Sequence, residues 1–90
     1  MEYTNRGAEI FGENLYFLRK VHRLSQRELA KIAGISLYCL RKAEHGIFTD
    51  TLCIDAIFRI SRHFHLRPAT LFAPQAEWSI SMLLNGEEDI

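Results

Sequence analysis

Hydrophobic positions along the chain recur with the spacing of α-helices. The first clear stripe lies at i, i+4, i+7 and i+11 and consists of Phe11, Leu15, Leu18 and His22. This spacing puts all four side chains on one face of a helix. No segment alternates apolar and polar residues as a half-buried strand would. The pattern therefore predicts an all-α fold.

A second helix begins after Ser25, where the sequence has the form of a capping box. The Ser25 hydroxyl can accept a hydrogen bond from the amide of Glu28, and the Glu28 carboxylate can accept one from the amide of Ser25. The helix is predicted to end at Gly34, because glycine tolerates the left-handed backbone of a sharp turn.

A third helix is predicted after the turn Gly34-Ile35-Ser36, with Ser36 as its cap and Gly46 as its stop. Around its axis Leu40 and Ala43 point toward the core. The opposite face carries a mixed set of apolar and basic side chains, namely Leu37, Tyr38, Arg41, Lys42 and His45.

A fourth helix is predicted from Leu52 to Phe64. Its apolar stripe is formed by Cys53, Ile57, Ile60 and Phe64 and is reinforced by Ile54 and Phe58. A single turn then runs from Arg67-Pro68 to Phe72, because proline suits the first position of a helix.

A last helix is predicted from Gln75 to Leu84, followed by a frayed acidic tail, residues 87–90. This helix is apolar over much of its circumference, so it needs two packing partners or one large one. Packing within the chain and a homodimer interface both meet this need. The candidate interface residues are Trp78, Ile80, Met82, Leu83 and Leu84.

The window from Gln26 to Gly46 has the spacing of a helix-turn-helix, with two short helices joined by a three-residue turn. Ala30 is small where the two helices cross. Gln26 starts its helix where an amide side chain and a backbone N–H can both meet a phosphate.

The segment LSQRELAKIAGIS, followed by a helix that closes in Glu-x-Gly, resembles the Cro/cI-type helix-turn-helix regulators, also called the XRE family. The resemblance covers residues 12–72. It implies a compact five-helix, lambda-repressor-like DNA-binding domain over residues 10–73. Residues 1–9 would be an N-terminal extension, and residues 74–90 an extra helix and acidic tail that form a candidate dimerisation element.

The resemblance also implies roles for individual residues. Arg19 and Glu44 would form an ion pair between the first and third helices. The loop 46–49 would touch the DNA backbone. The implied DNA contacts are Gln26, Arg27, Ser36, Leu37, Tyr38, Arg41, Lys42 and His45. The expected function is a sequence-specific transcriptional regulator, expected to repress, that binds a two-fold operator as a homodimer.

Four apolar residues among the implied DNA-contacting positions and the loop 46–49 favour an alternative function. Family members often carry polar residues where Leu37 and Tyr38 stand, and Ile47 and Phe48 occupy a loop that is usually basic. Ile47 and Phe48 are expected to pack on the core or on a dimer mate. The alternative is a protein–protein interaction module, or an antitoxin-like partner, with weak or no DNA binding.

The charge distribution agrees with a DNA-binding centre. Eleven basic and eleven acidic residues give a net charge of zero, but ten basic and four acidic residues lie between Arg19 and Arg67, a local charge of +6. The two ends carry the compensating −6. This distribution predicts modest, salt-sensitive affinity for nucleic acid.

Other function classes lack the residues they require. The sequence contains no nucleophile–base set and no glycine-rich phosphate loop, so no enzyme activity and no cofactor are expected. His63 and His65 do not share a helix face, which argues against a metal site. A membrane span, a signal peptide and a separate small-molecule domain are not expected either. Cys39 and Cys53 are expected to be reduced thiols of a cytoplasmic protein.

Overall fold

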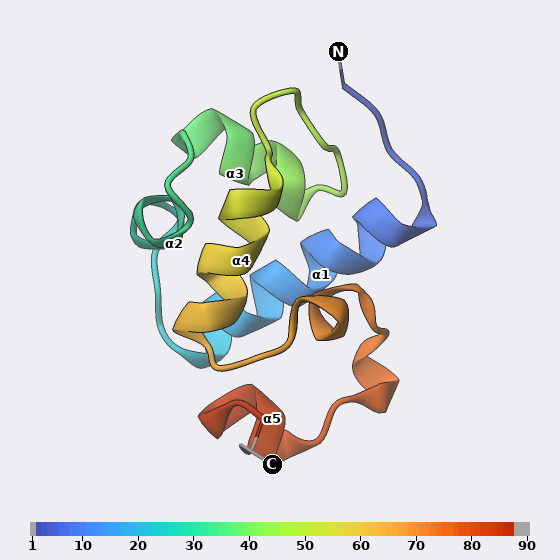
Figure 1. Cartoon of the computed structure of the whole chain (residues 1–90), viewed down its shortest axis with the longest axis vertical. Helices are drawn as coiled ribbons and strands as arrows, with labels where there is room; N and C mark the ends of the chain where they lie inside the picture. The colour runs from blue at the N-terminus through green and yellow to red at the C-terminus, as the bar shows by residue number, and fades with distance from the viewer. Residues whose placement is uncertain (1, 88–90) are drawn as a thin grey trace.

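The computed structural model describes residues 2–87, and within this range the fold is helical, with one isolated antiparallel bridge between Tyr3 and Phe48. The predicted all-α class is confirmed for these residues (Figure 1). The helices are α1 (Arg6–Val21), α2 (Gln26–Ala33), α3 (Leu37–Glu44), α4 (Ile54–His63) and α5 (Ile80–Asn85), with 3-10 turns η1 (Pro68–Phe72) and η2 (Gln75–Glu77).

Helix α1 crosses the middle of the molecule and contacts α3, η1 and α5 (Figure 1). Its predicted stripe is confirmed, since Phe11, Leu15 and Leu18 are fully buried. Gly12 allows the close approach to α3, because a Cβ atom there would lie 2.3 Å from the carbonyl oxygen of Ala43. At the C-terminal end of α1, His22 Nε2 donates to the carbonyl oxygen of Leu83, 2.9 Å away.

The two predicted short helices and the turn between them are confirmed. The Ser25 hydroxyl accepts from the Glu28 amide at 3.0 Å, and the Glu28 carboxylate accepts from the Ser25 amide at 2.8 Å. Gly34 has φ = +71°, the left-handed conformation expected of the residue that ends α2. Ser36 caps α3 by accepting from the amide of Cys39 at 3.0 Å.

The N-terminal boundary differs from the expectation. Helix α1 begins at Arg6, because Asn5 caps it by accepting a hydrogen bond from the amide of Ala8 at 2.8 Å. Residues 6–9, assigned to an extension, therefore form the first turn of α1. Residues 3 and 4 lie along the loop after α3, where Tyr3 pairs with Phe48.

Helix α4 buries a narrower face than predicted. Ala56 and Ile60 lie in the core, whereas Ile54 is 68% exposed, Phe58 is 43% exposed and the Cys53 cap is also exposed. The exposed pair is four residues apart and lies opposite the buried pair, so α4 carries apolar residues on two faces. Apolar spacing alone could not decide which face packs.

The last helix is also shorter than predicted. A 3-10 turn ends at Glu77, Trp78 is extended, and α5 begins only after Ser79, whose hydroxyl accepts from the Met82 amide at 3.1 Å. The break turns Trp78 into the core, where its indole N–H donates to the carbonyl oxygen of Ala73 at 3.1 Å. The turn predicted from Arg67-Pro68 to Phe72 is present as the 3-10 turn η1.

The first tail residue is not frayed. The Glu87 carboxylate accepts from Arg67 Nε at 2.5 Å and from the hydroxyl of Thr70. The backbone amide of Glu87 donates to the carbonyl oxygen of His65 at 2.9 Å. The rest of the predicted tail, residues 88–90, lies outside the described residues. Within residues 2–87, none of the helices combines the length and the apolar character that a membrane crossing requires.

Candidate nucleic-acid interface

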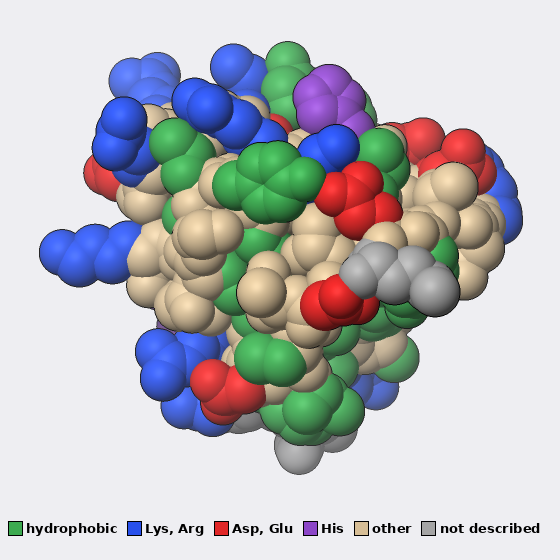
Figure 2. All heavy atoms as spheres, turned by 90° about the horizontal axis from the view of Figure 1, so that it is seen from above, with side chains coloured by type: hydrophobic (Ala, Val, Ile, Leu, Met, Phe, Trp, Pro, Cys, Tyr) green, Lys and Arg blue, Asp and Glu red, His purple; other side chains and the backbone are tan. Residues whose placement is uncertain are grey.

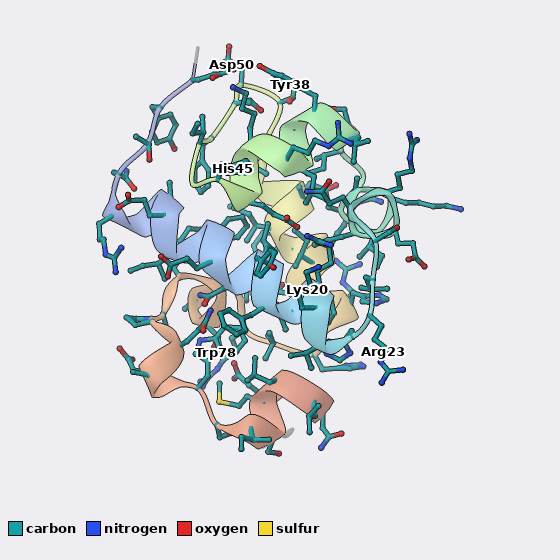
Figure 3. All side chains as sticks on the ribbon, turned by 180° about the vertical axis from the view of Figure 1, so that it is seen from behind. Lys20, Arg23, Tyr38, His45, Asp50 and Trp78 are labelled. Atoms are coloured by element: carbon teal, nitrogen blue, oxygen red, sulfur yellow. The ribbon has the colours of Figure 1, made fainter. Side chains whose placement is uncertain are left out.

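The outer face of α3 brings several predicted residues together. Cys39, Leu40 and Ala43 are buried, which turns Tyr38 and Arg41 outward, with Tyr38 58% exposed. Leu37 and Lys42 flank them and are half-buried, and His45 is exposed just after the helix. Tyr38 and His45 lie at the α3 end of the molecule, far from Trp78 (Figure 3). The structure thus gathers five predicted residues on one surface, Leu37, Tyr38, Arg41, Lys42 and His45.

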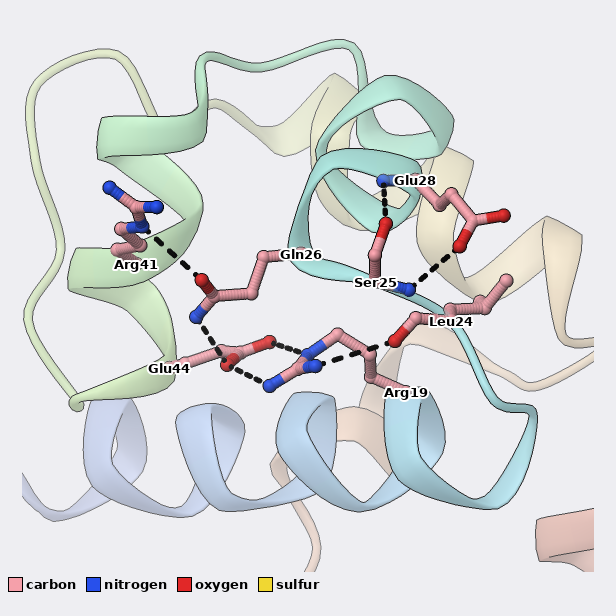
Figure 4. A network of polar contacts seen from close by, with 7 residues as sticks. All are labelled: Arg19, Leu24, Ser25, Gln26, Glu28, Arg41 and Glu44. Atoms are coloured by element: carbon pink, nitrogen blue, oxygen red, sulfur yellow. Dashed lines mark hydrogen bonds and ion pairs between the residues drawn. The ribbon is translucent and has the colours of Figure 1, made fainter.

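A buried ion pair joins α1 to the end of α3. Arg19 Nε donates to Glu44 Oε2 at 2.7 Å, and Arg19 Nη2 donates to Glu44 Oε1 at 3.0 Å. The two side chains are only 10% and 5% exposed. Arg19 Nη1 also donates to the carbonyl oxygen of Leu24, just before α2. The ion pair that the family resemblance implied is therefore present (Figure 4).

Gln26 extends this network to the outer face of α3. Its Nε2 donates to Glu44 Oε1 at 3.2 Å, and its Oε1 accepts from Arg41 Nε at 3.2 Å (Figure 4). Arg19, Glu44, Gln26 and Arg41 thus form one hydrogen-bonded chain through three helices. The chain fixes where the Arg41 guanidinium lies relative to the start of α2. The sequence did not suggest the contact between Gln26 and Arg41.

Two other predicted residues have different surroundings. The Ser36 hydroxyl accepts a hydrogen bond from the Cys39 backbone amide and so caps α3. Arg27 is exposed in the first turn of α2 and adds a positive charge next to Gln26.

An acidic residue lies against the outer face of α3. The Tyr38 hydroxyl donates to Glu2 Oε2 at 2.6 Å, and Lys42 Nζ lies 3.4 Å from Glu2 Oε1. Lys42 Nζ also lies over the Tyr38 ring, 5.5 Å from its centroid. The hydrogen bond from Tyr38, aided by Lys42, lowers the pKa of Glu2 below 4.5, and the same bond raises the pKa of Tyr38 above 10.0. Sequence reasoning missed Glu2, because no local pattern links residue 2 to residue 38.

The loop after α3 packs inward. The Phe48 ring makes edge contacts with Phe11 at 5.4 Å and with Tyr3 at 5.6 Å between centroids. Phe48 therefore packs on the protein's own core, one of the two arrangements expected for it. Ile47 beside it is half-buried.

Charge is unevenly distributed over this end of the molecule. Figure 2 shows the α3 end of the molecule from above, with most Lys and Arg side chains on one side and hydrophobic side chains at the centre. Asp and Glu side chains lie next to the hydrophobic ones. In the part of the chain that the structure describes, no three His, Cys, Asp or Glu side chains gather as metal ligands would. The Lys and Arg side chains are the groups of this face that carry the charge a polyanion would require.

The proposed dimer residues separate into two groups. Trp78 fills the chain's own core and is only 9% exposed, which removes it from the candidate interface. Met82 and Leu83 are partly buried against the same core. Ile80 and Leu84 remain on the surface, 75% and 54% exposed.

The chain was compared with protein-family models, with curated proteins and with solved structures, and none of the three comparisons gave a match.

Proposed function

We propose that the protein is a DNA-binding transcriptional regulator of the Cro/cI type, with a lambda-repressor-like arrangement of helices. The observation that carries the proposal is the hydrogen-bonded chain from Arg19 through Glu44 and Gln26 to Arg41, which fixes the outer face of α3 against α1 and α2. An α-helix with its side chains is about 10–12 Å across. The major groove is about 12 Å wide, so it admits a helix such as α3.

Four residues of this surface and of the start of α2 have assigned roles in the proposal. The Arg41 guanidinium reads base edges, because its paired N–H donors match the acceptors of guanine. Gln26 and Arg27 bind phosphates at the positive end of α2. Leu37 offers apolar contact, for which a thymine methyl is the matching group.

The proposal includes a homodimer on a two-fold operator, with repression by occupation of that operator. The exposed Ile80 and Leu84 on α5 support a second copy as the partner, since an apolar patch gains by being covered. The protein would act in the cytoplasm, without catalysis or cofactor.

Selection of bound sequences from a random DNA pool, followed by titration of the selected DNA at several salt concentrations, tests the proposal. Recovery of a palindromic sequence and affinity that falls steeply with salt are expected. The double variant Arg41→Ala/Lys42→Ala should lose binding. A matched variant, Arg6→Ala/Arg62→Ala, removes the same charge away from α3 and should retain most of the affinity. No enrichment and no binding at low salt would exclude the function.

A protein partner is the second candidate function, and the exposure of Tyr38 favours it. Tyrosine is enriched at the centres of protein interfaces, and at 58% exposure this ring has room for a contact. The selection experiment separates the two functions, because a protein-binding module would recover no common DNA sequence.

A further inference from the structure

The N-terminal segment holds a carboxylate on the surface that the proposed function assigns to DNA. Glu2 meets two groups of α3, accepting a hydrogen bond from the Tyr38 hydroxyl at 2.6 Å and lying 3.4 Å from Lys42 Nζ. One carboxylate oxygen faces each donor. The Tyr38 hydroxyl and the Lys42 ammonium therefore form a two-donor anion site, and Glu2 is its present occupant.

Backbone contacts hold the segment in place. The Tyr3 amide donates to the Phe48 carbonyl oxygen at 3.0 Å, and the Phe48 amide donates to the Tyr3 carbonyl oxygen at 2.8 Å. The Thr4 hydroxyl donates to the Gly46 carbonyl oxygen at 2.6 Å. The Tyr3 ring also packs edge-on against Phe48. These contacts set Glu2 at a defined point on α3.

We propose that a DNA backbone phosphate binds at Tyr38 and Lys42 and that Glu2 competes with it for this site. The proposal rests on the proposed function and adds a built-in competitor to it. Tyrosine hydroxyls and lysine ammonium groups are common phosphate ligands, and the donors that hold a carboxylate also suit two phosphate oxygens.

The contact can open without unfolding the domain. The Glu2 and Lys42 side chains are 41% and 33% exposed, so the Glu2 side chain can turn away from α3 while the contacts of Tyr3 and Thr4 with the loop after α3 remain. An exposed ion pair and one hydrogen bond are each worth little in water. Glu2 therefore weakens DNA binding rather than preventing it, and it also neutralises one of the two basic residues of α3.

The experiment compares the affinity of Glu2→Gln and Glu77→Gln for the same DNA at low salt. Both variants remove one negative charge, but Glu77 lies in η2, on the opposite side of α1 from α3 (Figure 1). Glu2→Gln should bind about 3- to 10-fold more tightly than Glu77→Gln, the range expected when an exposed pair and a hydrogen bond no longer compete. Glu2→Ala should show at least the same gain, since it removes both acceptor oxygens whereas Glu2→Gln keeps one.

A second comparison tests whether the gain acts through Lys42. In a Lys42→Gln background the gain from Glu2→Gln should shrink, because the phosphate site has lost its ammonium group. Equal affinity of Glu2→Gln and Glu77→Gln would overturn the competition, while binding by the unmodified chain would leave the proposed function standing. No binding by any of these proteins, Glu2→Gln included, would overturn the competition and the proposed function together.

Discussion

Gln26 and Arg41 are hydrogen-bonded across the turn between α2 and α3, with Arg41 Nε donating to Gln26 Oε1 at 3.2 Å. The bond joins the first residue of α2 to an outward-facing residue of α3. Because Gln26 also donates to Glu44, the surface residue Arg41 is connected to the buried ion pair of Glu44 with Arg19. The position of the Arg41 side chain on the outer face is thus linked to the ion pair inside the protein.

Removing one partner of the buried ion pair should strongly destabilise the fold. We expect Arg19→Ala to lower the free energy of unfolding by about 3–5 kcal/mol, because the Glu44 carboxylate is left buried without its counter-charge. Urea denaturation followed by circular dichroism measures the loss. Arg59→Ala is the control, since its ion pair with Asp55 is 52% and 67% exposed and such pairs add little stability. Similar losses for the two variants would contradict the prediction.

Removing the Ser36 cap of α3 should lower the free energy of unfolding. Ser36→Ala is expected to cost about 1 kcal/mol, because the Cys39 amide loses its hydrogen-bond acceptor. Ser36→Asp restores an acceptor and should recover most of the loss. Chemical denaturation of both variants tests this, and equal stability of Ser36→Ala and the unmodified chain would show that the cap is not needed.

Substituting Trp78 should change the stability of the fold, whereas substituting Ile80 and Leu84 should change the oligomeric state. Trp78→Ala should lower stability by about 3–5 kcal/mol because it opens a cavity under α1. The double variant Ile80→Asp/Leu84→Asp should leave stability nearly unchanged and convert a dimer into a monomer, as measured by light scattering at micromolar concentration. If the unmodified chain has the mass of one chain at that concentration, the surface of α5 is not a dimer interface.

The contact between Glu2 and Tyr38 should depend on pH at both extremes. The folded protein lowers the pKa of Glu2 from 4.5, so the contact is complete above 4.5 and is lost as the pH falls through the lowered value. It raises the pKa of Tyr38 from 10.0, so the contact is complete below 10.0 and is lost as the pH rises through the raised value. Carbon-13 NMR of the Glu2 carboxyl and the Tyr38 ring carbon that bears the hydroxyl follows both titrations.

The variant Tyr38→Phe supplies the control for this titration. It removes the hydrogen bond that lowers the pKa of Glu2 most, so the Glu2 midpoint should rise toward 4.5. An unchanged midpoint in Tyr38→Phe would mean that the two groups do not meet in solution.

The parts of the fold that follow from short-range rules could be predicted from the sequence. The capping box of Ser25 and Glu28 and the left-handed turn at Gly34 each depend on residues three or fewer positions apart, and the structure has both. The stripe of α1 could also be predicted, because Phe11, Leu15 and Leu18 recur at helical spacing, and the structure buries all three.

The remaining parts depend on competition between local signals or on distant contacts. Ser79 competes as a helix cap with the apolar pattern from 75 to 84, and burial of Trp78 decides the outcome. Ile54 and Phe58 look like core residues until the packing of α2 selects the other face of α4. Of the candidate site, the residues of α3 could be found by counting around a helix, whereas Glu2 could not, since 36 residues separate it from Tyr38.

Arg19 lies in the last turn of α1 and His22 directly follows the helix, yet the two side chains bind different helices. His22 donates to the Leu83 carbonyl of α5, and Arg19 binds Glu44 at the end of α3. Residues three apart on a helix have Cβ atoms about 5–6 Å from each other. Helices α3 and α5, which Figure 1 draws at the top and the bottom of the view, are therefore both bonded to the C-terminal end of α1, at points about 4.5 Å apart along the helix axis.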